Sequence, residues 1–133
     1  MRRAARHAEG WLPYLYTPEM LADSMGKIAR FTEDAGRPAG TVQGGLFAFT
    51  CVHEDRDQAL ALANEQLSRQ YNQDFSKLVE KYTIAGAPQD CVARIREYID
   101  AGARTIMFSA GCPPEYTEEN TRLIAETILP AFR

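Results

Sequence analysis

The stretch that decides the fold is residues 85–111, AGAPQDCVARIREYIDAGARTIMFSAG, which reads as a turn, a helix, a second turn and a strand. Pro88 suits the first turn of a helix, where its missing N–H costs nothing, and Gly102 is a typical stop. The apolar side chains between them recur at spacings of three and four, at Val92, Ile95 and Ile99. This spacing predicts one buried helix face. Residues 105–108, TIMF, run apolar without alternation, as in a strand covered on both sides.

The rest of the chain continues this alternation of helices and strands. Thr17-Pro18-Glu19 predicts a helix start, because it combines a hydroxyl cap, a proline and an acid in the first turn. Gly44 and Gly45 are expected to weaken or bulge the longest strand. In chain order we expect a helix at 1–8, a strand at 10–15, a helix at 17–35, a strand at 41–52, helices at 55–71, 72–82 and 88–101, a strand at 105–108 and a helix at 117–132.

Each expected helix has a face that should be buried. The predicted inward side chains are Leu21, Met25, Ile28 and Thr32 or Phe31 in the second helix, Ala59, Leu60, Ala63 and Leu67 in the third, Phe75, Leu78, Val79 and Tyr82 in the fourth, and Ile124, Ile128 and Phe132 in the last. Helices that alternate with apolar strands predict a parallel sheet with right-handed crossovers. We expect a single domain over residues 1–133 with no linker.

Chain length limits how large this α/β fold can be. A whole (β/α)₈ barrel takes about 250 residues, and the 133 residues here provide for three or four strand–helix units. The sequence therefore predicts either a smaller fold or a piece of a barrel. Active sites of such barrels lie at the carboxyl ends of the strands. That rule selects residues 11–16, 50–55 and 109–114.

Composition excludes several classes of function. The chain is 45% hydrophobic and 25% charged, as in a globular protein with a real core. A formal charge of −3 without a basic tract gives no reason to expect a nucleic-acid partner. No apolar run approaches the roughly 20 residues of a membrane helix, and residues 1–10 lack the apolar core of a signal peptide. We therefore expect a cytoplasmic protein with no membrane partner.

The three cysteines, Cys51, Cys91 and Cys112, are widely spaced and include no C-x-x-C pair. This pattern fits reduced thiols rather than disulfides or a zinc site, and we expect no metal. Cys51 is expected in the core, whereas Cys112 lies in a glycine-proline turn and should be more exposed. No base is visible that would make Cys112 a nucleophile.

Three stretches of the sequence resemble the carboxyl-terminal portion of the luciferase-like monooxygenases. They are residues 3–13 (RAARHAEGWLP), residues 47–63 (FAFTCVHEDRDQALALA), and residues 84–108 together with the final ILPAFR. Their order and spacing match the last strand–helix units of that family, although no one motif is diagnostic. Position 87, often a Thr or Ser cap in the family, is Ala87, which predicts a helix start weaker by about 1 kcal/mol.

The resemblance implies a partial (β/α)₈ TIM barrel made of about the last three strand–helix units. It also implies a flavin- or deazaflavin-dependent oxidoreductase or monooxygenase that acts on a small organic substrate, with FMN or a deazaflavin as cofactor. The family's phosphate-binding loop and first strands are missing from these residues. We therefore expect these residues alone to be inactive and to bind no cofactor.

The cofactor contacts predicted in the first part of the chain are Arg2, Arg3 and Trp11. In the family, the helix that carries these arginines points its amino end at the cofactor phosphate, and a guanidinium would add to that attraction. The alternative is a solvated basic face. Trp11 could flank the cofactor or substrate, and the alternative is a core aromatic side chain. Tyr14 is the corresponding candidate for a substrate contact.

The remaining site candidates come from two later strand ends. Ser109, Ala110 and Gly111 could hydrogen-bond the cofactor edge, or could simply shape a turn. His53 could contact the substrate as an acid or base near neutral pH. The alternative is a solvated turn residue beside Glu54.

A non-catalytic partial-barrel module is the alternative function. Three parallel strands leave two unpaired edges and an uncovered apolar face. We therefore predict a homodimer or larger assembly in which two copies complete each other's core, with exchange of elements as one route. The helical stretch 55–82 is the element expected to be exchanged or to form the interface.

Overall fold

The computed structural model describes residues 1–133, which form two compact units. The first unit comprises residues 1–47 and 97–107, and the second comprises residues 48–96 and 108–133. Three elements pass from one unit into the other, namely β2 (Gln43–Val52), α5 (Pro88–Asp100) and β4 (Ala103–Ala110). The single domain expected from the sequence stays a prediction.

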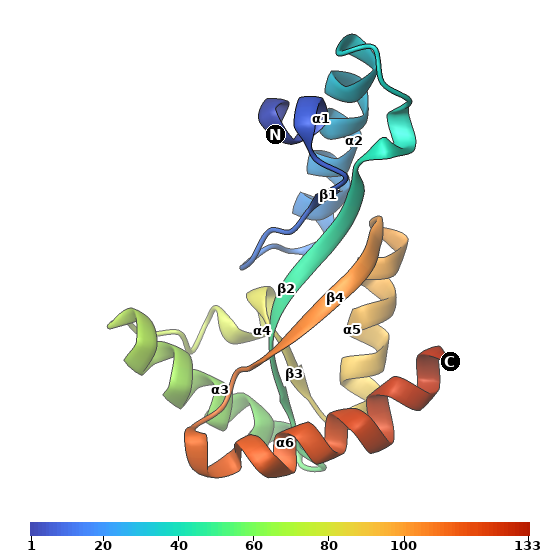
Figure 1. The fold of residues 1–133 in the computed structure, drawn as a ribbon. Helices are drawn as coiled ribbons and strands as arrows, with labels where there is room; N and C mark the ends of the chain where they lie inside the picture. The colour runs from blue at the N-terminus through green and yellow to red at the C-terminus, as the bar shows by residue number, and fades with distance from the viewer. The chain divides into compact units, whose positions relative to one another are not determined.

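A parallel sheet is built around β2, as predicted (Figure 1). β1 (Gly10–Trp11) pairs with the start of β2, and β3 (Ile84–Gly86) pairs with its end. β4 also pairs with β2. The sheet is not closed into a barrel.

The first unit holds two helices that pack on each other, α1 (Arg2–His7) and α2 (Pro18–Asp34). The predicted start of α2 is confirmed, because the Thr17 hydroxyl accepts a hydrogen bond from the Met20 N–H at 3.1 Å. The buried side chains of α2 are Pro18, Leu21, Ser24, Ile28 and Thr32, with Met25 and Phe31 half-buried. Thr32 therefore takes the inward position that the sequence left open between Thr32 and Phe31.

Gly44 and Gly45 do not interrupt β2, contrary to the expected weakening or bulge, because the strand runs unbroken through both. Both glycines permit close approach of neighbouring chains. A Cβ on Gly44 would lie 2.6 Å from the Gly102 carbonyl oxygen, and a Cβ on Gly45 would lie 2.7 Å from Leu12 Cδ1. At Gly44 the close atom belongs to the backbone, so the absence of a side chain there is a packing requirement.

The second unit contains the remaining helices. They are α3 (Arg56–Tyr71), α4 (Val79–Tyr82), α6 (Thr117–Leu123), a π-helical turn (Ile124–Ile128), and 3₁₀ turns at Pro114–Tyr116 and Leu129–Phe132. A further 3₁₀ turn, Ala39–Thr41, belongs to the first unit. The predicted cap of α3 is confirmed, since an Asp55 carboxylate oxygen accepts from the Asp57 N–H at 2.9 Å. The predicted inward side chains Ala59, Ala63 and Leu67 are buried.

The helix predicted at 72–82 is wrong over most of its length, because only Val79–Tyr82 is helical. Asn72 adopts the left-handed conformation (φ 51°) that ends α3. The Asp74 carboxylate then accepts from the Ser76 N–H at 2.9 Å, a local turn that competes with helix formation. Phe75 and Val79 are nevertheless buried, as predicted.

The short strand β3, Ile84–Gly86, was not predicted. It pairs with Thr50, Cys51 and Val52 of β2. Gly86 then turns the chain into α5 with a φ of 151°, a value that L side chains rarely adopt. Asp90 compensates for the weak cap at Ala87, because its carboxylate accepts from the Ala87 N–H at 3.0 Å.

Three predicted burial patterns need correction. The buried face of α5 is centred on Cys91, Ile95 and Tyr98, while Val92 and Ile99 are only half-buried. β4 is not covered on both sides within the chain, and the Met107 side chain is 50% exposed. In the last helical segment Ile128 is buried but Phe132 is exposed, because the π and 3₁₀ turns rotate it out of the regular helical phase.

Candidate functional site

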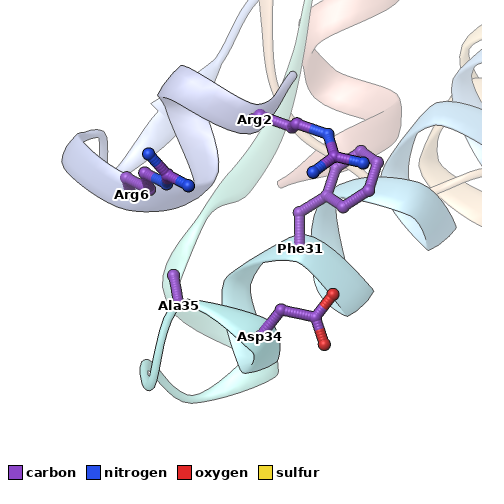
Figure 2. Close-up of a pocket in the computed structure, with 5 residues that line it drawn as sticks. All are labelled: Arg2, Arg6, Phe31, Asp34 and Ala35. Atoms are coloured by element: carbon purple, nitrogen blue, oxygen red, sulfur yellow. The ribbon is translucent and has the colours of Figure 1, made fainter.

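Arg2 and Phe31 form one wall of a small pocket in the first unit (Figure 2). The Arg2 guanidinium carbon lies 4.6 Å from the centre of the Phe31 ring, in cation–π contact. Arg6, Asp34 and Ala35 complete the pocket, which has a volume of about 60 Å³. The Asp34 carboxylate makes this pocket unsuitable for an anion.

A second hollow beside α1 is lined only by basic side chains and histidine. Its lining residues are Arg2, Arg3, Arg6 and His7, and its volume is about 330 Å³. A hydrogen bond from Arg37 Nη1 to the Ala5 carbonyl oxygen, 2.8 Å long, ties α1 to the segment that follows α2. The predicted pair Arg2 and Arg3 therefore opens onto one electropositive hollow, which is a suitable environment for an oxoanion.

Trp11 and Tyr14 lie at different positions along β2, the neighbour that both contact. Trp11 pairs with Gly44, the second residue of β2, whereas Tyr14 bridges to Phe47 further along. Trp11 is half-buried and meets the Tyr16 ring edge-on at 5.5 Å, while Tyr14 is 56% exposed. The strand expected at 10–15 is thus only Gly10–Trp11, so Trp11 is its last residue and Tyr14 lies beyond its carboxyl end.

In the second unit, the ends of β2 and β4 lie side by side. Gly111 follows β4, and its N–H donates to the Thr50 carbonyl oxygen at 2.9 Å. A Cβ on Gly111 would lie 3.0 Å from the Thr50 nitrogen, so the two strand ends approach closely there. The Gly111 N–H is thus used within the fold. The predicted polar contacts of this turn depend instead on Ser109, which is half-buried, and on Ala110, which is exposed.

Two side chains that the sequence analysis missed hold the end of β2. Asn120 of α6, 1% exposed, accepts from the Val52 N–H at 2.8 Å and donates to the Thr50 carbonyl oxygen at 2.9 Å. The Tyr116 hydroxyl donates to the Val52 carbonyl oxygen at 2.7 Å. These side chains supply hydrogen bonds that a neighbouring strand would otherwise make. An asparagine inside an apolar helix face was the one available signal.

His53 comes directly after this anchored strand end. Its ring stacks on the Tyr116 ring with centroids 5.7 Å apart and planes 25° apart. Its Nδ1 accepts from the Asp55 N–H at 2.9 Å. His53 is half-buried. The contacts with Tyr116 and Asp55 fix the orientation of its ring.

All three cysteines are buried, which corrects the exposure expected for Cys112. Burial raises the pKa of the Cys51 thiol and of the Cys91 thiol to about 12. Burial also raises the pKa of Cys112. A thiol that stays protonated at neutral pH is a poor nucleophile. The expectation that Cys51 is a small core residue is thereby confirmed.

Alkaline pH is expected to weaken the fold through these thiols. An unfolded thiol ionises near its ordinary pKa of 9.0, whereas the folded Cys51 and Cys91 thiols hold their protons until about 12. Stability from these groups is therefore complete below pH 9 and falls as the pH rises towards 12. Urea unfolding at several pH values in this window should show the decline. The double variant Cys51→Ala, Cys91→Ala should show a shallower decline, and equal slopes would contradict this explanation.

No group of three or more His, Cys, Asp or Glu side chains is placed to hold a metal ion. None of the helices has both the length and the apolar character that a membrane span requires.

Solved structures with this arrangement define the class of fold. A coenzyme F420-dependent tetrahydromethanopterin reductase from Methanopyrus kandleri matches 99% of the chain with a TM-score of 0.74 and 20% identity. The monooxygenase RslO1 from Streptomyces bottropensis matches 99% with a TM-score of 0.75 and 20% identity. An F420-dependent secondary alcohol dehydrogenase, solved with an F420–acetone adduct, matches 99% with a TM-score of 0.77 and 14% identity. The chain covers 48%, 44% and 45% of these proteins, about half their length.

The fold is therefore a partial (β/α)₈ barrel of parallel strands, as the sequence predicted. The model of the luciferase-like monooxygenase family matches residues 1–105, and the chain belongs to that family. No curated protein matches the chain.

Proposed function

We propose that the chain is the carboxyl-terminal part of a flavin- or deazaflavin-dependent oxidoreductase or monooxygenase that acts on a small organic substrate. The observation that carries the proposal is the basic hollow of Arg2, Arg3, Arg6 and His7 in a member of this family. The guanidinium groups that line this hollow fit the phosphate that FMN and deazaflavin cofactors carry, and Arg2 and Arg6 also line the neighbouring pocket that contains Asp34. The donor set therefore fits the cofactor that the family implies.

FMN or a deazaflavin, when bound, would supply the redox step. In the first unit, Arg2 and Arg3 would hold the phosphate, Trp11 would flank the cofactor, and Tyr14 would meet the substrate. The exposed fraction of Tyr14, 56%, leaves its ring and hydroxyl available for this contact.

In the second unit, Ser109 would donate a hydrogen bond to the cofactor edge, and Ala110 would let the cofactor approach the backbone closely, while Gly111 packs against Thr50 and holds this turn in place. His53 would contact the substrate. The protein thus supplies orientation and exclusion of water, while the cofactor carries the electrons.

The direct test is to purify the product of the complete reading frame that contains these residues and record its visible absorption and fluorescence. A retained flavin or deazaflavin spectrum is the expected result. Reconstitution with FMN and with coenzyme F420 should restore the spectrum after the cofactor has been stripped. A colourless protein that takes up neither cofactor would contradict the proposed function.

Self-association is the second candidate function, and a specific observation favours it. The large apolar side chains that the first unit exposes include Leu12 at 45%, Tyr14 at 56% and Met107 at 50%. We propose that a second copy of the chain covers them in a homodimer or larger assembly. Exposed apolar surface next to an open sheet edge favours such contacts.

Sedimentation at micromolar concentration tests this assembly. The wild-type chain should sediment as a dimer or larger species. Met107→Lys should weaken association at least about tenfold, because it places a charge where apolar surface would be buried. Met20→Lys on α2, 38% exposed in the wild type, is the matched control and should leave the assembly intact. A wild-type monomer would contradict the proposal.

A further inference from the structure

The anchored strand end in the second unit determines what the His53 imidazole can do. Neutral histidine carries one proton and one free ring nitrogen. The Asp55 N–H donates to Nδ1 at 2.9 Å, so the lone pair lies on Nδ1 and the proton on Nε2. In this state Nε2 cannot accept a proton, although it can donate a hydrogen bond.

The surroundings of Nε2 leave this donor without a partner inside the chain. The pKa of the Glu119 carboxyl is lowered mainly by its hydrogen bond with Arg122, and His53 contributes least. Glu119 is itself bonded to Arg122, whose Nε donates to it at 2.8 Å. Both oxygens of this carboxylate accept from Arg122, and no hydrogen bond joins it to His53.

Tyr116 and Asn120 are the residues that keep the imidazole in this orientation. The Tyr116 ring is stacked on the imidazole, and its hydroxyl is bonded to the Val52 carbonyl oxygen at 2.7 Å. Asn120 bonds the Val52 N–H at 2.8 Å. On the other edge, the His53 N–H donates to the Gly86 carbonyl oxygen at 3.1 Å. The backbone that carries His53 is thus bonded on both sides.

We infer that His53 is a fixed hydrogen-bond donor through Nε2, directed at an oxygen acceptor of the ligand, and that Tyr116 and Asn120 are its positioning residues. The inference rests on the proposed function for its ligand, and it narrows the role of His53 there. A carbonyl, carboxylate or phosphate oxygen satisfies this donor, whereas a group that must lose a proton to His53 does not. The ligand atom facing His53 is therefore an acceptor.

Nitrogen-15 NMR of the chain at pH 8, without cofactor, tests the protonation state directly. The expected spectrum shows His53 protonated at Nε2 alone and a scalar coupling across the hydrogen bond between the Asp55 amide nitrogen and Nδ1. His7→Gln leaves His53 as the one remaining histidine and secures the assignment. Protonation at Nδ1, or absence of the coupling, would overturn the inference.

Two variants separate positioning from a merely structural role. Tyr116→Leu removes the stacked ring, and it should shift the His53 ring protons and reduce the coupling at least twofold. Tyr116→Phe keeps the ring and should preserve both signals although it lacks the hydroxyl bond. Unchanged His53 signals in Tyr116→Leu would remove Tyr116 from the positioning role. Because none of these signals requires a flavin, a failed cofactor titration would contradict the proposed function and leave this result standing.

Discussion

Asn120→Ala is expected to lower the free energy of unfolding by about 3 kcal/mol. The substitution removes the partner of the Val52 N–H and one of the two partners of the Thr50 carbonyl, and both of these residues are buried. It also leaves a void where a side chain that is 1% exposed now packs. A buried amide that loses its partner bears the full cost of its lost hydration.

Urea unfolding followed by circular dichroism measures this loss. Thr121→Ala, one residue further along α6 and exposed, is the matched control and should change stability by less than about 0.5 kcal/mol. Asn120→Asp keeps an acceptor for Val52 but sets a carboxylate oxygen against the Thr50 carbonyl, so it should destabilise at least as much. An Asn120→Ala variant as stable as the control would show that water or a local shift replaces these bonds.

Gly44→Ala is expected to cost about 3 kcal/mol, the upper end of the range for overpacking. The new methyl group would lie 2.6 Å from the Gly102 carbonyl oxygen and 3.0 Å from Met25 Sδ. Met25 can move, but the carbonyl belongs to the backbone, so β2 and the chain before β4 would have to separate.

The matched control, Gly26→Ala, is expected to change stability in the opposite direction. Gly26 lies inside α2, and a Cβ there would meet nothing within 4 Å. Gly26→Ala should therefore stabilise the protein by up to about 1 kcal/mol, because alanine favours the helical backbone. Thermal unfolding of the two variants beside the wild type gives both values. Similar midpoints for both variants would contradict the close approach at Gly44.

Local chemistry made much of the fold predictable. Thr17 and Asp55 cap their helices as expected, because an N-cap acts on backbone groups two or three residues away. The apolar density of residues 46–52 likewise identified β2. Both signals are contained in short windows of sequence, and the parallel order of the strands follows from their alternation with helices.

Long-range pairing explains what the sequence did not reveal. β3 has three residues, too few for a periodic pattern, and exists because β2 offers it an edge. Asn120 is 68 residues away from Val52, so no local rule connects them. The same limit applies to the candidate site: Arg2, Arg3 and His53 were found as residue types near expected element ends. The ring orientation of His53 depends on Tyr116, which only the fold brings near.

The affinity of the protein for FMN and for coenzyme F420 is the most direct test of the proposed cofactor site. Equilibrium fluorescence titration should be made on the product of the complete reading frame that contains these residues. We expect saturable binding of one of the two cofactors. Arg2→Glu with Arg3→Glu should weaken binding at least about tenfold, because two phosphate contacts become repulsive. Arg30→Glu, an exposed site on α2, should not. Absence of binding, or equal affinity in all three proteins, would contradict the proposed cofactor site.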